Sequence, residues 1–326
     1  MDILNPQNLR KEADRALARG REPKKVLLAY VLGITGLSLL SLGLSELMGS
    51  LSADQGGLSN LGTHAIYQTA QQVIPMLASF VAMCLELGYL GAMLRISRGQ
   101  YADHTDLKVG FQKFWPLLRL TILQGLIFLG VGVLAVQLSS VVFAMTPWAQ
   151  PVMDALVALE VTDPAMLTEA DVLALLEVMG PMYIIAGIVY LALLIPVLFR
   201  LRLASYCLLD DPQGRALAAL GTSNRLMRRR FLPMLKVDLS LWVYYLATAV
   251  MTVVMYLDLI LALLGVQLPL EGKLFSLLVY LAALVMQFGI QYLLRSRVEL
   301  TYLAAYDKLR EKPRDSGVVL GNIFDM

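Results

Sequence analysis

Five polar side chains lie inside long apolar stretches of this 326-residue sequence: Glu86, Arg119, Gln124, Gln287 and Gln291. About 13 Å of helix separates Glu86 from Arg95, which places Glu86 near the middle of a membrane-spanning helix. A charge at that depth costs a few kcal/mol on insertion scales, so this carboxyl must be neutral, paired or facing water. Arg119, in the next apolar stretch and closer to its polar end, is the candidate partner.

These five residues form a candidate intramembrane polar site with two interpretations. Amide side chains within a membrane usually link helices, each worth about 0.6 kcal/mol. Gln287 and Gln291 share one face of a helix and suit that role. The alternative is a polar pathway for a solute. For Glu86 a structural and a functional role are equally open.

A second polar motif, Leu208-Leu209-Asp210-Asp211-Pro212, precedes a cytoplasmic helix expected over 213–229. Asp211 is expected to cap that helix with Pro212 at its first position, and the positive helix end favours both carboxylates. Catalysis by Asp210 and Asp211 would need a third group, and none stands beside them. The other end of the helix carries basic residues expected to face anionic lipid: Arg225, Arg228, Arg229 and Arg230.

Motifs of known enzyme classes are missing from the sequence. It contains no Walker loop, no dinucleotide fingerprint and no Gly-x-Ser-x-Gly elbow. His64 and His104 are expected on opposite sides of the membrane, which argues against a His–His metal site. We therefore expect no catalytic residue, no metal and no cofactor.

Composition predicts the elements that position these residues. Hydrophobic residues make up 58% of the chain and charged residues 16%, against roughly 25% charged in ordinary soluble proteins. Apolar runs long enough to cross a ~30 Å hydrocarbon core predict an all-α, polytopic membrane helix bundle of six transmembrane helices. The expected spans are 26–48, 72–94, 115–142, 181–199, 239–263 and 274–294.

Basic residues predict the orientation. Of the 27 Lys and Arg residues, 25 lie in the amino-terminal segment, the loops between spans two and three and between spans four and five, and the segment after span six; Arg119 lies near the start of span three, beside the first of these loops, and only Lys273 lies on the other side. Cytoplasmic loops retain Lys and Arg, so both termini are expected in the cytoplasm. Nucleic acid is not an expected partner, because this topology accounts for the basic residues.

Three segments are expected outside the spans. Residues 1–25 predict a basic interfacial helix, capped by Asn5 with Pro6 at its first position, or else a solvated leader. The acidic external loop 146–180 predicts short helices over 151–160 and 164–178, as a binding element or a solvated loop. Residues 301–326 are expected to form a cytoplasmic tail that follows the membrane domain 26–300.

A resemblance to a known family rests on residues 195–245. Ile195-Pro196, Tyr206, Leu209-Asp210-Asp211-Pro212, Ser223, Leu226-Met227 and Asp238-Leu239-Ser240-x-Trp242 resemble a family of uncharacterised bacterial integral membrane proteins, a domain of unknown function. That family is distantly similar to the membrane domain of some glycerophosphodiester phosphodiesterases. Departures from its pattern are Val197 for the turn glycine, Asp211 for asparagine, and an arginine where the glycine after Leu-Met is expected. The resemblance implies a multi-pass protein of the bacterial inner membrane and no assigned activity.

Two functions follow as hypotheses. The first is a non-enzymatic accessory or scaffold component of a membrane complex, with a membrane-protein partner or a second copy of the chain. The alternative is a carrier for lipid or a small amphiphilic solute, based on Glu86, the glutamines and a weak repeat between 114–119 and 231–236. Membrane lipids, including anionic headgroups, are expected partners of either.

Overall fold

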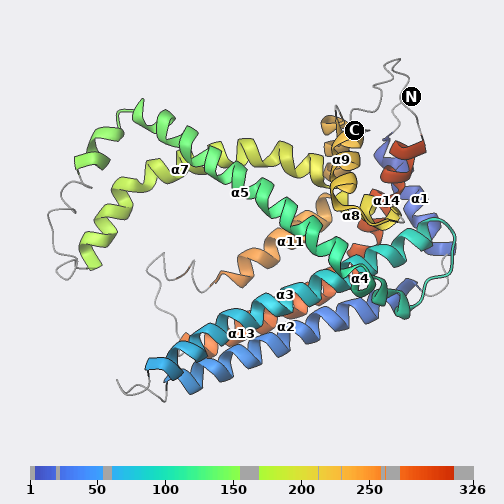
Figure 1. The fold of residues 1–326 in the computed structure, drawn as a ribbon, viewed down its shortest axis with the longest axis horizontal. Helices are drawn as coiled ribbons and strands as arrows, with labels where there is room; N and C mark the ends of the chain where they lie inside the picture. The colour runs from blue at the N-terminus through green and yellow to red at the C-terminus, as the bar shows by residue number, and fades with distance from the viewer. Residues whose placement is uncertain are drawn as a thin grey trace. The chain divides into compact units, whose positions relative to one another are not determined.

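A computed structural model of the chain describes residues 4–19, 23–53, 61–154, 169–211, 213–228, 230–257, 261 and 272–311. Every regular element in these ranges is a helix (Figure 1). The all-α class predicted from the sequence is confirmed.

Five helical stretches of the described residues are long and apolar enough to cross a membrane: Pro23–Met48, Thr69–Ser97, Phe114–Ala144, Met179–Asp210 and Leu277–Glu311. A sixth crossing is added if the bent pair of helices α10 (Phe231–Ser240) and α11 (Trp242–Met255) counts as one span. The chain is therefore a multi-pass helical membrane protein.

The fifth predicted span, 239–263, is not one straight helix where the structure describes it. The helix axis bends by 72° between α10 and α11. The backbone N–H of Leu241 donates to the carbonyl of Asp238 at 2.9 Å, a tight turn in place of the α-helical bond. The Ser240 carbonyl accepts a hydrogen bond from Arg10 Nη1 at 3.2 Å. The bend between α10 and α11 thus leaves the Ser240 carbonyl without a helical partner, and Arg10 of the amino-terminal helix supplies the hydrogen bond.

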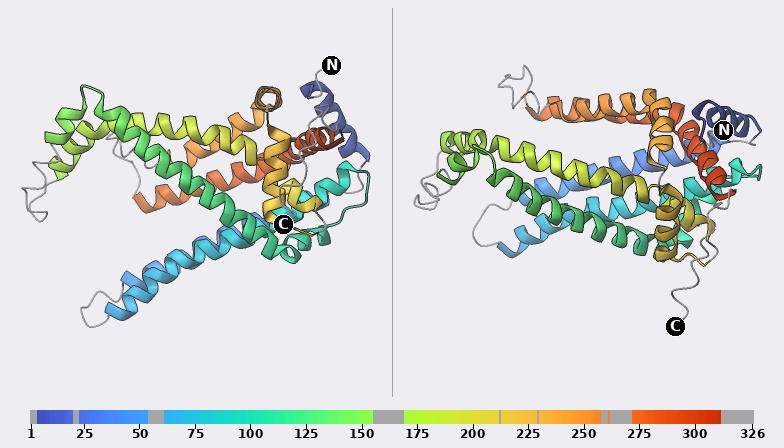
Figure 2. Two further views of the ribbon diagram at one scale, coloured as in Figure 1. Left: turned by 45° about the horizontal axis from the view of Figure 1, so that its top comes forward. Right: turned by 90° about the horizontal axis from the view of Figure 1, so that it is seen from above.

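The chain divides into two compact units. Unit 1 comprises residues 1–117, 205–214 and 232–326, and unit 2 comprises 118–204 and 215–231. In unit 1, helix α2 (Pro23–Ala53) lies along α3 (Leu61–Ser97), as the views of Figure 2 agree. Short elements follow α3, namely η2 (His104–Leu107) and α4 (Lys108–Gln112), and α8 covers Ala204–Asp210.

The carboxy-terminal part of unit 1 is helical and buried rather than a tail. Helix α13 (Gly272–Ile290) continues through a π-helical turn, η4 (Gln291–Arg295), into α14 (Ser296–Glu311). Leu303 and Ala305 on α14 are fully buried. Residues 301–311 of the segment expected as a cytoplasmic tail belong to α14 and contribute to the core of unit 1, and residues 312–326 lie outside the described residues.

Helix α1 (Pro6–Arg19) begins as the sequence predicts, since Asn5 Oδ1 accepts a hydrogen bond from the backbone N–H of Gln7 at 3.0 Å. Its apolar face does not need a membrane surface, because α1 packs against α14 and buries Leu9 and Ala13. Ion pairs flank this contact. Asp14 accepts two hydrogen bonds from Arg297, at 2.7 and 2.6 Å, and Lys308 lies 2.6 Å from Glu12.

Unit 2 contains most of α5 (Phe114–Ala144) and the whole of α7 (Glu169–Leu201) and α9 (Ala216–Met227). Helix α9 packs against α7, where the Ser223 hydroxyl donates to the carbonyl of Arg200 at 2.8 Å. Helix α7 runs without interruption through Pro181, so the predicted helix 164–178 and the fourth span form one helix from Glu169. Residues 155–168, which include most of the predicted helix 151–160, lie outside the described residues.

The expected cap of the cytoplasmic helix 213–229 is wrong. Helix α9 begins after Arg215, with no side-chain cap. Asp211 Oδ1 instead accepts a hydrogen bond from the backbone N–H of Gln213 at 3.0 Å. Gly214 then adopts φ +60°, a left-handed conformation that an α-helix cannot contain, so the helix starts beyond it. Pro212 lies outside the described residues.

Close backbone contact holds α4 against α3. A methyl group at Gly110 would lie 1.7 Å from the backbone oxygen of Cys84, and one at Gly88 would lie 2.2 Å from that of Leu107. Neither oxygen can move without moving a helix. Glycine at these two positions therefore sets the distance between α3 and the segment that follows it.

Gly110→Ala should lower the free energy of unfolding by more than about 2 kcal/mol, because overpacking against backbone cannot relax through a side chain. Gly43→Ala on α2 is the matched control, since a methyl group there meets nothing within 4 Å. That control should be neutral or slightly stabilising. Thermal unfolding of both variants in lipid nanodiscs measures the difference, and equal midpoints would contradict the contact.

Candidate functional site

An ion pair inside the apolar part of unit 1 joins three helices. Both oxygens of the Glu86 carboxylate on α3 are engaged: Arg295 donates through Nη2 to Oε1, and the Tyr30 hydroxyl on α2 donates to Oε2. About 16 Å of helix separates Glu86 from Ser97, where α3 ends, so the pair lies within the span. We define the intramembrane cluster as Tyr30, Glu86, Gln291, Arg295 and Glu299.

Arg295 is the centre of the intramembrane cluster. Its side chain is only 13% exposed. Nη1 donates to Gln291 Oε1 at 2.9 Å, and Nη2 lies 3.6 Å from Glu299 Oε1. The guanidinium also lies over the rings of Tyr30 and Tyr89, 5.2 and 5.7 Å from their centroids. Two carboxylates and two aromatic faces thus surround one buried cation, which favours its charged form.

The cluster extends to α8 through Glu299. The Tyr206 hydroxyl donates to Glu299 Oε2 at 2.6 Å. Two polar atoms next to this network, the Tyr89 hydroxyl and Arg295 Nε, are buried without a hydrogen-bond partner among the residues that the structure describes. The oxygens of both carboxylates thus face donors from neighbouring helices. The arrangement is therefore suited to joining helices.

The predicted polar residues are distributed over both units. Glu86 and Gln291 meet at Arg295, and Gln287 lies one turn before Gln291 on α13, half-buried. Arg119, which is exposed, and Gln124, which is half-buried, lie on α5 in unit 2. In unit 1 the partner of Glu86 is Arg295, not the predicted Arg119.

Sequence reasoning missed Tyr30, Arg295 and Glu299. Arg295 was assigned to the basic residues that follow span six, since it ends the apolar run. A signal for it exists in the sequence: Gln287, Gln291, Arg295 and Glu299 recur every four residues, and residues four apart share one face of a helix. A polar stripe that continues past the end of a span would have indicated a buried site.

Asp210 forms a second ion-pair cluster at the end of α8. Arg98 Nη1 donates to its Oδ1 at 2.8 Å, the Tyr306 hydroxyl donates to its Oδ2 at 3.1 Å, and Arg310 also donates to Oδ2. The Asp210 side chain is 12% exposed. This carboxylate therefore links the end of α3 with α14, instead of capping a following helix as expected.

Lys113 satisfies the backbone at the same end of α8. Its Nζ donates to the carbonyls of Leu208, Leu209 and Asp211 at 3.3, 3.0 and 3.2 Å. The carbonyls of Leu208 and Leu209 lie in the last turn of α8, and that of Asp211, just beyond it, also accepts from the backbone N–H of Gly214 at 3.1 Å. A cation suits this negative end of a helix. Burial lowers the pKa of Lys113, while the negative charge of Asp211 opposes that shift.

Comparison of the chain with models of protein families, with curated proteins and with solved structures found no match. Within the described ranges, no group of three or more His, Cys, Asp or Glu side chains could hold a metal ion.

The basic residues of α9 differ from those of the ion-pair clusters. Arg225 and Arg228 are exposed, Arg230 is half-buried, and Arg229 lies outside the described residues. Leu217 is 72% exposed, whereas Leu220 and Met227 are buried. The three apolar side chains therefore do not share one exposed face of α9.

Replacing Glu86 or Arg295 should lower the free energy of unfolding by roughly 1.5–3 kcal/mol, the range for loss of a hydrogen bond to a charged group. The remaining Arg295 retains Glu299 at 3.6 Å, and the remaining Glu86, 33% exposed, retains Tyr30. The double variant Glu86→Gln/Arg295→Gln should be more stable than the sum of the single effects predicts. The free energies of unfolding of the unaltered chain, the two single variants and the double variant, measured in the same detergent, form a double-mutant cycle. Additive effects would show that the two side chains do not interact.

Tyr30→Phe should lower the free energy of unfolding by about 2 kcal/mol, because it removes a hydrogen bond to a charged group. Tyr89→Phe is the matched control: the two rings stack with centroids 4.5 Å apart, but the Tyr89 hydroxyl has no partner among the described residues. That control should be neutral or stabilising. Thermal unfolding in nanodiscs compares the two, and a larger loss for Tyr89→Phe would contradict the assignment.

Proposed function

We propose that this chain is a non-enzymatic component of a membrane protein complex, embedded in the bacterial inner membrane. The observation that carries the proposal is the apolar surface of unit 2. In the most apolar 18-residue stretch of the span Met179–Asp210, no residue is buried. Ile184 and Ile188 on α7 are 65% and 63% exposed.

Small residues on the same helices support helix–helix contact in addition to contact with lipid. A methyl group at Gly130 or Gly132 on α5, or at Gly180 or Gly187 on α7, would meet nothing within 4 Å. Glycine allows the backbones of membrane helices to approach closely, and helix–helix interfaces in membranes are enriched in it. The partner that fits is therefore another transmembrane helix, from a different chain or a second copy.

The state of the charged groups supports a structural role. Both carboxylate oxygens of Glu86 are bonded within the chain, as are those of Asp210. A carrier would need such groups to face a passing solute, and these face their own helices. The accessory or scaffold function is accordingly preferred to the carrier.

The contact between α1 and α14 supports an even number of crossings. Helix α1 precedes the first span, α14 is the charged carboxy-terminal end of the stretch Leu277–Glu311, and the two helices pack together through the Asp14–Arg297 and Glu12–Lys308 pairs. Such exposed ion pairs are unfavourable within hydrocarbon, so this contact favours both segments on one side of a membrane. Together with the basic residues on these helices, this arrangement supports both termini in the cytoplasm, with α10 and α11 forming one bent span.

Purification from native membranes with a lipid-retaining polymer should recover the chain together with a stoichiometric partner or a second, differently tagged copy. Gly187→Leu should reduce that recovery by blocking close approach to α7. Gly43→Leu on α2 is the matched control in unit 1 and should leave the complex intact. Recovery of the unaltered chain alone, as a monomer, would refute the proposal.

A further inference from the structure

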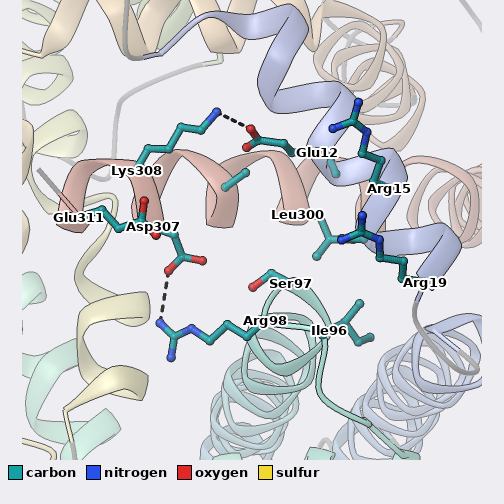
Figure 3. Close-up of a pocket in the computed structure, with 14 residues that line it drawn as sticks. Glu12, Arg15, Arg19, Ile96, Ser97, Arg98, Leu300, Asp307, Lys308 and Glu311 are labelled. Atoms are coloured by element: carbon teal, nitrogen blue, oxygen red, sulfur yellow. Dashed lines mark hydrogen bonds and ion pairs between the residues drawn. The ribbon is translucent and has the colours of Figure 1, made fainter.

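A cavity of about 490 Å³ lies in unit 1 between α1, the end of α3 and α14 (Figure 3). Arg15 and Arg19 stand on successive turns of α1 at one side of it, and Arg98 and Asp307 lie at the other. All residues that line the cavity belong to unit 1.

Most of the acidic side chains around this cavity are already neutralised. Lys308 pairs with Glu12 at 2.6 Å, and Arg98 pairs with Asp307 at 3.3 Å. Arg15 and Arg19 form no ion pair with any residue that the structure describes, and Glu311 is the remaining carboxylate of the lining. The cavity therefore keeps an excess of positive charge at the side formed by α1.

The two arginines are placed for a shared anion. Residues four apart lie on one face of a helix with their Cβ atoms about 5–6 Å apart, where like charges repel each other. An anion between them removes that repulsion. Guanidinium groups bind phosphate oxygens through paired N–H donors, so phosphate is the anion that this geometry suits best.

The floor of the cavity is apolar. Ile96, Leu300 and Ala13 contribute to its lining and are 2%, 1% and 1% exposed. The cavity also lies at the level where spans begin and end, since α3 ends at Ser97 and α2 begins at Pro23, shortly after α1. An apolar floor beneath a cationic rim at a membrane boundary matches the headgroup region of a phospholipid, where the phosphate meets the glycerol backbone.

We propose that this cavity binds a phospholipid through its headgroup phosphate, with Arg15 and Arg19 as the donors. The ion pairs Glu12–Lys308 and Asp307–Arg98 keep the neighbouring carboxylates from repelling the phosphate. A bound lipid bridges α1, α3 and α14, so the site both recognises the lipid and stabilises the cytoplasmic end of unit 1. The proposal does not depend on a protein partner.

Binding of short-chain phosphatidylglycerol to the full-length chain in uncharged detergent, measured by native mass spectrometry, tests the site. Arg15→Gln/Arg19→Gln should weaken binding about thirtyfold, because each basic residue near a headgroup contributes a factor of about five. Lys11→Gln/Lys108→Gln is the matched control in unit 1, with the same loss of two positive charges from exposed side chains outside the cavity lining, and should bind like the unaltered chain. Circular dichroism and the thermal midpoint of both variants confirm that they fold.

Two further ligands separate the lipid from other sources of phosphate. Glycerol phosphate should bind far more weakly than phosphatidylglycerol, because it lacks the acyl chains that reach the apolar floor. Equal loss of binding in the site and control variants would overturn the proposal, since general surface charge would then explain the affinity. Equal affinity for glycerol phosphate would also overturn it, in favour of a soluble phosphate ligand.

Discussion

The ion pair between Glu86 and Arg295 is the interaction on which the arrangement of unit 1 depends. A single charge in an apolar environment is expensive, and a pair is tolerated when further hydrogen bonds satisfy both partners. Tyr30 provides one such bond to Glu86, and Gln291 provides one to Arg295. Satisfying these two charges therefore fixes α2, α3 and the end of α13 relative to one another.

The π-helical turn η4 is the backbone feature that accompanies this pair. It contains Gln291 and Arg295 at its two ends. An extra residue in one turn rotates the helix that follows by about 100° relative to an uninterrupted α-helix. Helix α14 is thereby oriented with Leu300, Leu303 and Tyr306 in the core, while Arg297 reaches Asp14 on α1. Single π-turns of this kind are frequent at functional sites.

The sequence predicts what depends on local composition and misses what depends on tertiary contacts. The apolar runs around α2, α3, α5 and α7 are predicted because their length alone determines that they can cross a membrane. The Asn5 cap is predicted because its hydrogen bond spans two residues. Arg295 as the partner of Glu86 is not predicted, because 209 positions separate the two in the chain.

One local prediction failed for a physical reason that lies in the neighbouring residues. Asp211 and Pro212 look like a helix start, but Gly214 takes a left-handed conformation, and a methyl group there would lie 3.1 Å from Cγ of Pro116. Residues 301–311 are polar by average composition. The structure buries them because α1 covers one side of α14, with its charged side chains paired at the edges of the contact.

Basic residues near the ends of the spans do more than set the topology. Arg98 and Arg310 neutralise Asp210, Lys113 bonds three carbonyls at the end of α8, and Arg295 is buried within the intramembrane cluster. Charges bound in this way cannot also attract lipid headgroups. A count of Lys and Arg therefore predicts orientation but overstates the surface charge. The arginines left for anionic ligands in the described part of the chain include Arg15 and Arg19, and these two share a cavity.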